Sequence, residues 1–489
     1  MTLPNTAASR LLRHRVLGPL LLLGVLAVAY RATTPLEING DGVGYIKRLA
    51  DTTLAPGHLL YLPLARIISG GGTPAEAVTK LRLLSLCCVL LALLVCYLAA
   101  RRRLGLAQAA LLTLMLGASQ AVFRAAREVE TYGPALLLCA IAFYAATRSC
   151  EQQTRSTFWA GVAGAACGAG ALFHLALALL GPALLVALFF GVDQGRRLRA
   201  SAAAAAFGLL AFIPVLHLCA LRSGISGWPS LISWLQSADH GIPYPLGPAT
   251  PLVAIWGLAR SLVYAPYPYQ AEQWLVLAAA LLAIATLVAW TSALAIRRQP
   301  SAPLVMSTPL LLFGLLFYPS DTERWVFVLP ALCLAGTLPR TRELWVLPIA
   351  MLVYNISAGQ PNAAERLRVQ RAEASELLLS SNDLLVAPGH GWTEQVGLRR
   401  QRVLQRYLLI FETGKHRSLQ RAISTMHQRI EHALARNQRV FVARLRDHTD
   451  QRGFKELARF GLSRADYEQL FTRYRLHPTM VSELAQIRR

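Results

Sequence analysis

The sequence is short of charged residues, and acidic residues are the scarcer kind. Of its 489 residues, 15% are charged, whereas soluble proteins carry about 25%. Lys and Arg number 49 and Asp and Glu only 26, so the net charge is +23. Hydrophobic residues make up 54% of the chain, and the mean hydropathy is +0.41. This composition excludes an ordinary soluble protein and predicts a membrane protein.

The cysteine pattern supports no covalent or metal framework. The chain has eight cysteines, nearly all within apolar stretches, where Cys acts as a small hydrophobic residue. No CxxC motif occurs, and residues 359–489 contain no Cys. The sequence therefore predicts neither a disulfide scaffold nor a Cys-based zinc site.

Two further absences exclude function classes. The sequence shows no internal repeat, which disfavours a transporter built from inverted repeats. Its arginines are spread along the chain rather than clustered with aromatic residues, so we expect no nucleic-acid partner. The positive charge is instead typical of cytoplasmic loops and of a basic segment near anionic lipid.

The apolar runs predict a polytopic helical membrane protein over residues 1–358. Each run approaches the length that a helix needs to cross the hydrocarbon core, and about eleven crossings are expected. The basic start of the chain resembles a signal peptide, but without a clear cleavage site an uncleaved first span is expected. The aromatic and proline residues of 250–270 favour an interfacial segment. The predicted spans are 16–31, 80–100, 105–122, 132–148, 157–173, 175–191, 200–221, 273–296, 303–318, 325–338 and 343–358.

Basic residues between these spans set the expected topology. The positive-inside rule places the N-terminus on the cytoplasmic side of an inner or plasma membrane. The odd number of crossings then places residues 359–489 outside, in the periplasm or its equivalent. The connections near 32–79, 124–131, His174, 222–272 and 319–324 are expected on that same outer side.

Residues 359–489 are polar and arginine-rich, and they predict a small soluble α/β domain. Apolar runs at 384–386, 407–411 and 440–442 are typical of strands. Between the last two, apolar residues at helical spacing predict a helix over 416–437. The turn Gly389-His390-Gly391 could bind phosphate, but the sequence favours an ordinary strand-to-helix turn.

Acidic residues gather in the expected outer connections. A carboxylate beside a bilayer is costly to maintain, so a cluster on one face indicates a functional site. Asp41 lies between Gly40 and Gly42, which let the backbone bend and expose the carboxylate. A plain Asx turn is the alternative interpretation.

The next outer connection, 124–132, carries four charges. Arg127, Glu128, Glu130 and Tyr132 are candidates here, and Arg124 and Glu128 are i,i+4 partners if this stretch is helical. An exposed, ion-paired helix cap would contribute little to stability and is the alternative.

Two histidines are candidates in the same outer layer. His58 follows a Pro-Gly turn and suits phosphate binding or acceptor orientation, whereas packing at the membrane interface would also explain it. His174 lies midway in an apolar stretch that must turn back there, so its imidazole either reaches the same cavity or is a hydrogen-bonded core residue.

The loop before the span at 325–338 holds Asp321, Glu323 and Arg324. A guanidinium at a helix end suits bidentate contact with a lipid phosphate. Anchoring to lipid headgroups is the alternative, but two neighbouring carboxylates would repel those headgroups.

These loops resemble the GT-C superfamily of multi-span glycosyltransferases, in particular bacterial relatives of the transmembrane O-mannosyltransferases. The similarity lies in Asp41 and the following Leu54–Tyr61 stretch, in Glu128-Val129-Glu130-Thr131-Tyr132, and in Phe173-His174-Leu175. Leu54 stands where the family has a histidine, and His58 replaces an aromatic residue.

The resemblance implies transfer of a sugar from a polyprenyl-phosphate donor to an acceptor hydroxyl on the outer face, with inversion. Asp41 would be the general base. Arg324, with His58 or Arg127, would bind the donor phosphate. Sugar or acceptor contacts would fall to the remaining candidates: Glu128, Glu130, Tyr132, His174, Asp321 and Glu323.

Two other classes stay open at this stage. A flippase or transporter of lipid-linked sugars would need charged residues deep within the spans, which are nearly free of them. A non-catalytic membrane scaffold would tolerate neutral replacements of the loop carboxylates. The expected partners are the lipid-linked donor, the bilayer and a protein, lipid or glycan acceptor. No cofactor is assigned, and participation of a divalent cation is left open.

Overall fold

The fold comes from a computed structural model, which describes most of the chain. The described residues are 7–38, 40–49, 54, 56–236, 247–265, 274, 277–278, 281, 302–317, 319–335, 345–361, 363–388, 396, 405–409, 413, 418–443, 458, 461–481 and 484–488. The predicted span 273–296 falls largely outside them, as does the Gly389–Gly391 turn.

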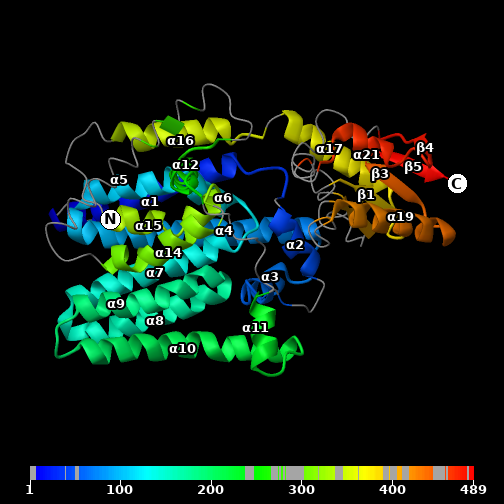
Figure 1. Ribbon diagram of the computed structural model, residues 1–489. Coiled ribbons are helices and arrows are strands. Elements are labelled where there is room, and N and C mark those ends of the chain that lie inside the picture. The colour runs from blue at the N-terminus through cyan, green and yellow to red at the C-terminus, as the bar shows by residue number, and fades with distance from the viewer. Residues whose placement is uncertain are drawn as a thin grey trace. The chain divides into compact units, whose positions relative to one another are not determined.

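The chain divides into two compact units (Figure 1). The helical unit comprises Met1–Thr34, Thr52–Ile68 and Lys80–Gln360. The sheet unit comprises Pro35–Asp51, Ser69–Thr79 and Pro361–Arg489, so it draws two short segments from the first outer connection.

The helical unit is built from apolar helices joined by short connections. Its helices are α1 (Ala7–Ala32), α3 (Tyr61–Ser69), α4 (Pro74–Leu104), α5 (Leu106–Ala118), α6 (Gln120–Arg127), α7 (Tyr132–Glu151), α8 (Ser156–Phe173), α9 (Leu180–Gly191), α10 (Arg197–Arg222), α11 (Trp228–Gln236), α12 (Thr250–Leu262), α14 (Ala302–Leu316), α15 (Leu329–Ala335) and α16 (Val346–Ala358). Short 3-10 turns are η1 (Gln153–Arg155), η2 (Leu175–Leu179) and η3 (Thr322–Trp325).

Small residues let the central helices approach closely. Helix α8 packs against α7 on one side and α10 on the other (Figure 1). A side chain at Gly164 would meet the backbone of Ala204, and one at Gly168 would meet the backbone of Gly208. Such small-residue contacts are typical of helices that associate inside a membrane, where apolar burial alone gives no advantage.

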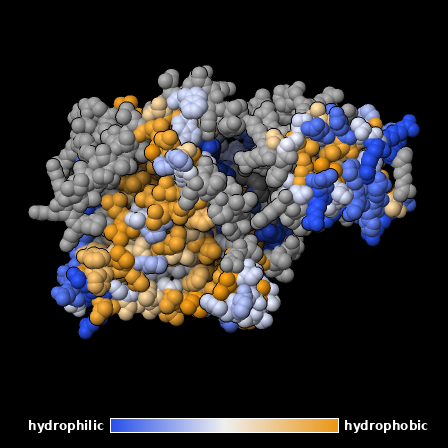
Figure 2. Space-filling model, in the orientation of Figure 1, coloured by the Kyte–Doolittle hydropathy of each residue, from blue (hydrophilic) through white to orange (hydrophobic). Residues whose placement is uncertain are grey.

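The described part of the helical unit is broadly apolar on the face seen in Figure 2. On α10 the exposed residues include Leu198, Phe207, Leu209, Leu210, Ile213, Leu218 and Leu221. Water would not favour such a face, whereas lipid would. Within the described residues, α4, α7, η1 with α8, and α10 are long and apolar enough to span a bilayer, and the bent pair α5–α6 is a fifth candidate. The eleven crossings stay a prediction.

Helices α5 and α6 meet at a bend of 67°, which a distant residue holds in place. The buried Asn355 side chain on α16 donates to the carbonyls of Ala118 and Leu262, at 2.7 and 2.9 Å, and accepts from Tyr264 N at 2.8 Å. One amide thus fixes the end of α5 and the end of α12. Both α6 and α12 then pack beside η3.

The sheet unit contains α2 (Gly40–Arg48), α17 (Ala363–Leu378), α19 (Leu419–Ala435), α21 (Arg464–Gln469) and a five-stranded mixed sheet. The strands are β1 (Leu384–Ala387), β2 (Gln405–Leu408), β3 (Val440–Ala443), β4 (Arg475–Pro478) and β5 (Leu484–Arg488), in the order β2-β1-β3-β5-β4. The predicted strands and the helix between them are confirmed. The β1 pairings are parallel, whereas β5 pairs antiparallel with β3 and β4.

The two faces of this sheet bury different residues. Leu384, Val386 and Val440 pack with Met426 and Ile430 of α19. The alternate residues, such as Leu385 and Phe441, pack with Ala372 and Leu379 at α17. This alternation is the period of a strand covered on both faces.

Candidate active site

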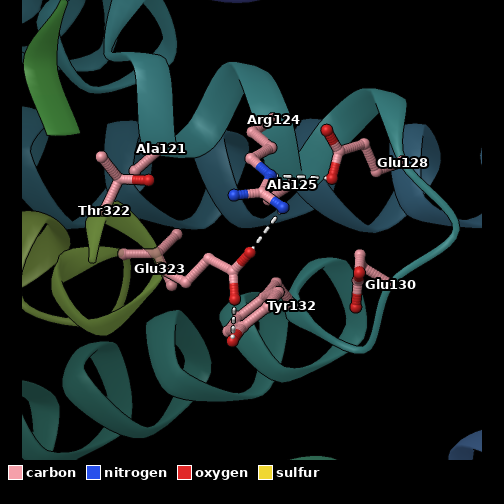
Figure 3. A pocket seen from close by; sticks show the side chains of 9 residues that line it. Ala121, Arg124, Ala125, Glu128, Glu130, Tyr132, Thr322 and Glu323 are labelled. Carbon is pink, nitrogen blue, oxygen red and sulfur yellow. Dashed lines mark hydrogen bonds and ion pairs between the residues drawn. The ribbon is translucent and has the colours of Figure 1, made fainter. Parts of the chain in front are cut away.

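Two predicted loops, far apart in sequence, meet at one network of charged side chains (Figure 3). Arg124 Nε donates to Glu128 Oε2 at 2.8 Å, and Arg124 Nη2 lies 2.6 Å from Glu323 Oε1. The Tyr132 hydroxyl donates to the other oxygen, Glu323 Oε2, at 2.8 Å. Arg124 is therefore central, although the sequence indicated it only as an ion-pair partner of Glu128.

Helix ends position each member of this network. Helix α6 ends at Arg127, and Glu128 turns the chain into an extended conformation while its carboxylate reaches back one helical turn. Tyr132 begins α7 after the short connection. Across the pocket, Asp321 Oδ1 accepts from Glu323 N at 3.1 Å and so caps η3.

The network lines a small cavity with a negative lining. Three carboxylates, Glu128, Glu130 and Glu323, face it together with the single guanidinium of Arg124. Glu130 is 3% exposed and projects into the same space in Figure 3. Carboxylate oxygens accept hydrogen bonds from hydroxyl groups, so this lining suits a polyol better than an anion.

A cluster of rings lies beside the network. The His174 ring centroid is 5.1 Å from that of Tyr132, 5.6 Å from that of His58 and 5.2 Å from that of Phe327. His58 Nδ1 lies 3.0 Å from the Phe173 carbonyl oxygen, which can only accept, so this nitrogen carries the proton. Both predicted histidines therefore lie in one ring cluster with residues of the 124–132 and 321–327 segments.

His174 is buried with an unsatisfied nitrogen. It ends α8, is 8% exposed, and its Nδ1 has no hydrogen-bond partner among the described residues. Burial, followed by the charges of His58 and Arg324, holds the pKa of His174 well below its usual value. The imidazole is thus neutral at physiological pH, and its Nδ1 can serve a ligand.

Asp321 and Arg324 form the outer part of the same loop. Arg324 Nε lies 3.8 Å from Asp321 Oδ2, and its guanidinium carbon is 5.7 Å from the Phe313 ring centroid. Burial, and then the charge of Glu323, raises the pKa of Asp321, while Arg324 opposes the rise. Arg324 keeps 24% of its side chain exposed, so it remains accessible to an anion.

Arg127 has a different environment from the other candidates. Its guanidinium donates to the carbonyls of Phe123 and Thr33, at 3.1 and 2.6 Å, and lies 3.5 Å from that of Gly359. It does not line the cavity described above. These contacts fasten the end of α6 to the end of α1.

Asp41 belongs to the sheet unit. It lies in the first turn of α2, and its side chain is exposed.

No metal site is built into this arrangement as far as the described residues go. Among them, no three His, Cys, Asp or Glu side chains are grouped to hold a metal ion.

These features define a class: a helical membrane protein with a polar, carboxylate-rich site where the connections between its helices meet. Comparison with known proteins agrees. Residues 75–218 match the family described as dolichyl-phosphate-mannose-protein mannosyltransferase. No curated protein matches this chain by sequence.

The fold is also similar to that of a solved structure. The chain is similar to ArnT from Cupriavidus metallidurans bound to undecaprenyl phosphate, with a TM-score of 0.61, 13% identity and coverage of 96% of this chain and 97% of that one. The apo state of the same protein matches with a TM-score of 0.60, 12% identity and coverage of 99% and 98%.

The resemblance to GT-C glycosyltransferases is thereby confirmed. The chain has an ArnT-like fold, mainly helical and completed by a small mixed sheet, and several of its apolar helices are long enough to span a membrane.

Proposed function

We propose that this protein transfers a sugar from a polyprenyl-phosphate carrier to an acceptor hydroxyl. The description of the matched family as a dolichyl-phosphate-mannose-protein mannosyltransferase supports this donor class, as does the undecaprenyl phosphate bound to ArnT. The observation that carries the proposal is the meeting of the 124–132 connection, His174 and the 321–324 loop at one cluster. Sugar hydroxyls are the groups that its neutral imidazole and its carboxylates recognise best.

The reaction is an inverting displacement. Asp41 takes the proton of the acceptor hydroxyl while that oxygen bonds to the anomeric carbon. The bond from this carbon to the phosphate oxygen breaks, and the electron pair leaves with the polyprenyl phosphate. One bond forms and one breaks, on opposite faces of the sugar, so the anomeric configuration inverts.

The donor phosphate carries negative charge both when it binds and when it departs, so it needs a positive partner throughout. Arg324 is our first choice, because its guanidinium is partly exposed and can form two parallel hydrogen bonds to phosphate oxygens. His58 is the second candidate. We assign Arg127 a positioning role instead, since its donors already face backbone carbonyls.

The carboxylates and rings around the cavity bind and orient the sugar or the acceptor. Glu130, Glu323 and Glu128 accept from hydroxyls, and His174 Nδ1 offers a further polar atom. Tyr132 and Arg124 each hold one oxygen of the Glu323 carboxylate, and Asp321 accepts from its backbone amide. A preorganised set of this kind fixes the anomeric carbon before attack.

The site is expected on the non-cytoplasmic face, with the N-terminus in the cytoplasm and the C-terminal residues outside. The basic connections between the spans support this orientation through the positive-inside rule. A reporter enzyme fused after Arg489 tests it, and a cytoplasmic signal would contradict it.

The transferase assignment is tested by a donor that cannot be cleaved. Purified protein in proteoliposomes receives a polyprenyl-phosphate sugar, or its phosphonate analogue with carbon in place of the bridging oxygen. We expect release of polyprenyl phosphate from the natural donor and no release or leaflet exchange with the analogue. Protein-dependent leaflet exchange of both donors, without cleavage, would instead indicate a flippase.

A further inference from the structure

Three arginines align across neighbouring strands of the sheet unit. In the β4–β5 pairing, Arg475 lies opposite Arg488. In the β3–β5 pairing, Val440 lies opposite Ile487, so Arg439, one residue earlier, lies opposite Arg488 as well. Neighbouring strands are about 4.8 Å apart. We call Arg439, Arg488 and Arg475 the arginine row.

All three side chains belong to the same face of the sheet. Ile487 packs with the α19 side, so Arg488, its neighbour in the strand, points to the opposite side. The guanidinium carbon of Arg439 lies 5.4 Å from the centroid of the Phe441 ring, which packs on the α17 side. Arg475 shares the orientation of Arg488 because the two are directly opposed.

Only one member of the row is neutralised. Arg439 binds Asp383 through two hydrogen bonds, Nε to Oδ1 at 3.0 Å and Nη2 to Oδ2 at 2.7 Å. Arg475 and Arg488 are exposed, and neither forms an ion pair within the part of the chain that the structure describes. His477 and Gln486, opposed in the next position of that face, extend the row with polar groups.

When no anion is bound, this arrangement lowers the stability of the sheet. Like charges directly opposite each other in a sheet are destabilising. The charge of the pair also reaches its neighbour: after burial, Arg488 and Arg475 are what lower the pKa of His477. A bound anion would remove the repulsion.

Protection of the sheet edge does not explain the pair. Charged residues on an edge strand discourage pairing with other chains, which accounts for Arg475 on the edge strand β4. Arg488 lies on β5, which has a strand on each side. Protection of an edge therefore does not account for Arg488, whereas an anion shared with Arg475 would.

We propose that two members of the arginine row, Arg475 and Arg488, form a phosphate-binding site with the side chains of His477 and Gln486 beside them. Each guanidinium can donate two parallel hydrogen bonds to phosphate oxygens, and two guanidinium groups on neighbouring strands can share one phosphate. The phosphate belongs either to a lipid headgroup or to a soluble phosphate ester. The site is independent of the sugar-transfer chemistry proposed above.

Amide hydrogen exchange of the full chain in nanodiscs tests this. One arm compares phosphatidylcholine nanodiscs with nanodiscs that also contain phosphatidylglycerol. The other adds inorganic phosphate to phosphatidylcholine nanodiscs. We expect slower exchange over residues 475–477 and 484–488 in at least one arm. A double variant, Arg475→Gln with Arg488→Gln, should need an at least about tenfold higher concentration of phosphatidylglycerol or phosphate for half-maximal protection. This is the effect of one lost charge-assisted hydrogen bond.

The matched control is Arg421→Gln with Arg436→Gln, which removes two exposed charges at α19 and should keep the protection. Protection by phosphatidylglycerol alone assigns a lipid headgroup, and protection by inorganic phosphate assigns a soluble ester. Unchanged exchange of the wild-type protein in both arms overturns the proposal. So does equal loss of protection in the two double variants.

Discussion

The Tyr132 hydroxyl donates a 2.8 Å hydrogen bond to Glu323 Oε2, and this contact joins residues 191 positions apart in the chain. It links the start of α7 to η3 and brings two charged connections to one place. Arg124 holds the other oxygen of the same carboxylate. Glu323 is therefore the group on which the geometry of the cluster depends.

Tyr132→Phe and Glu323→Gln should destabilise the protein non-additively. Each removes a hydrogen bond to a charged group, worth about 1.5–3 kcal/mol. The double variant should cost less than the sum, with a coupling energy of about 0.5–3 kcal/mol. Thermal unfolding in detergent, following the double-mutant cycle, measures this. Tyr144→Phe on the same helix is the control, and strict additivity would show that the contact does not form.

Arg324→Gln should weaken donor binding more than it slows transfer. Loss of a charge-assisted contact of about 1.5–3 kcal/mol corresponds to a rise in the donor KM of roughly 10- to 100-fold. Arg324→Lys should restore part of the loss, because it keeps the charge but not the planar fork. Steady-state kinetics with a polyprenyl-phosphate sugar provide the values. An exposed arginine, Arg199, replaced by Gln should leave KM unchanged; an equal effect there would contradict the assignment.

Acidification should destabilise the protein through His174. Its pKa is lowered by burial in the folded state, so the unfolded chain binds the proton first as pH falls below the usual value of 6.5. Stability from this residue is complete above that pH and declines below it, by at most about 1.4 kcal/mol per pH unit. In the His174→Gln variant the unfolding midpoint should depend less on pH than in wild type. His432→Gln, at an exposed site, should keep the wild-type dependence. Identical pH profiles for wild type and His174→Gln would refute the buried neutral state.

Gly257→Ala should shift the residues of the site, although Gly257 does not itself line the cavity. A methyl group at Gly257 of α12 would meet the Pro319 carbonyl and the Trp325 indole nitrogen, which flank the loop that bears Asp321 and Arg324. Overpacking of this kind costs about 1–3 kcal/mol. Transfer activity should fall in the folded protein. Gly181→Ala on α9, where a methyl group meets no atom within 4 Å, should retain full activity; parallel losses in both would exclude a positioning effect.

The sequence predicted what depends on local pattern and on topology. Glu130, His174 and Glu323 were expected together because span counting placed their connections on one side, and the structure brings all three to the cluster. In the sheet unit, the strands around Val386 and Val442 carried enough apolar residues to be recognised.

Features that depend on distant contacts could not be predicted. The bend between α5 and α6 is held by Asn355, far along the chain, and no proline marks it. Strand β4 holds a single large apolar residue, Leu476, so its sequence resembled a loop. The contacts of Arg127 could not be predicted either, because it donates to the carbonyl of Thr33, which lies at the end of a different helix.

The most direct test of the account is the comparison of wild type with Asp41→Asn in proteoliposomes supplied with a polyprenyl-phosphate sugar and an acceptor. We predict that Asp41→Asn binds the donor as wild type does but loses transfer by at least about 100-fold, the contribution of a general base. Asp193→Asn, at an exposed turn, should transfer normally. Undiminished transfer by Asp41→Asn would contradict the mechanism.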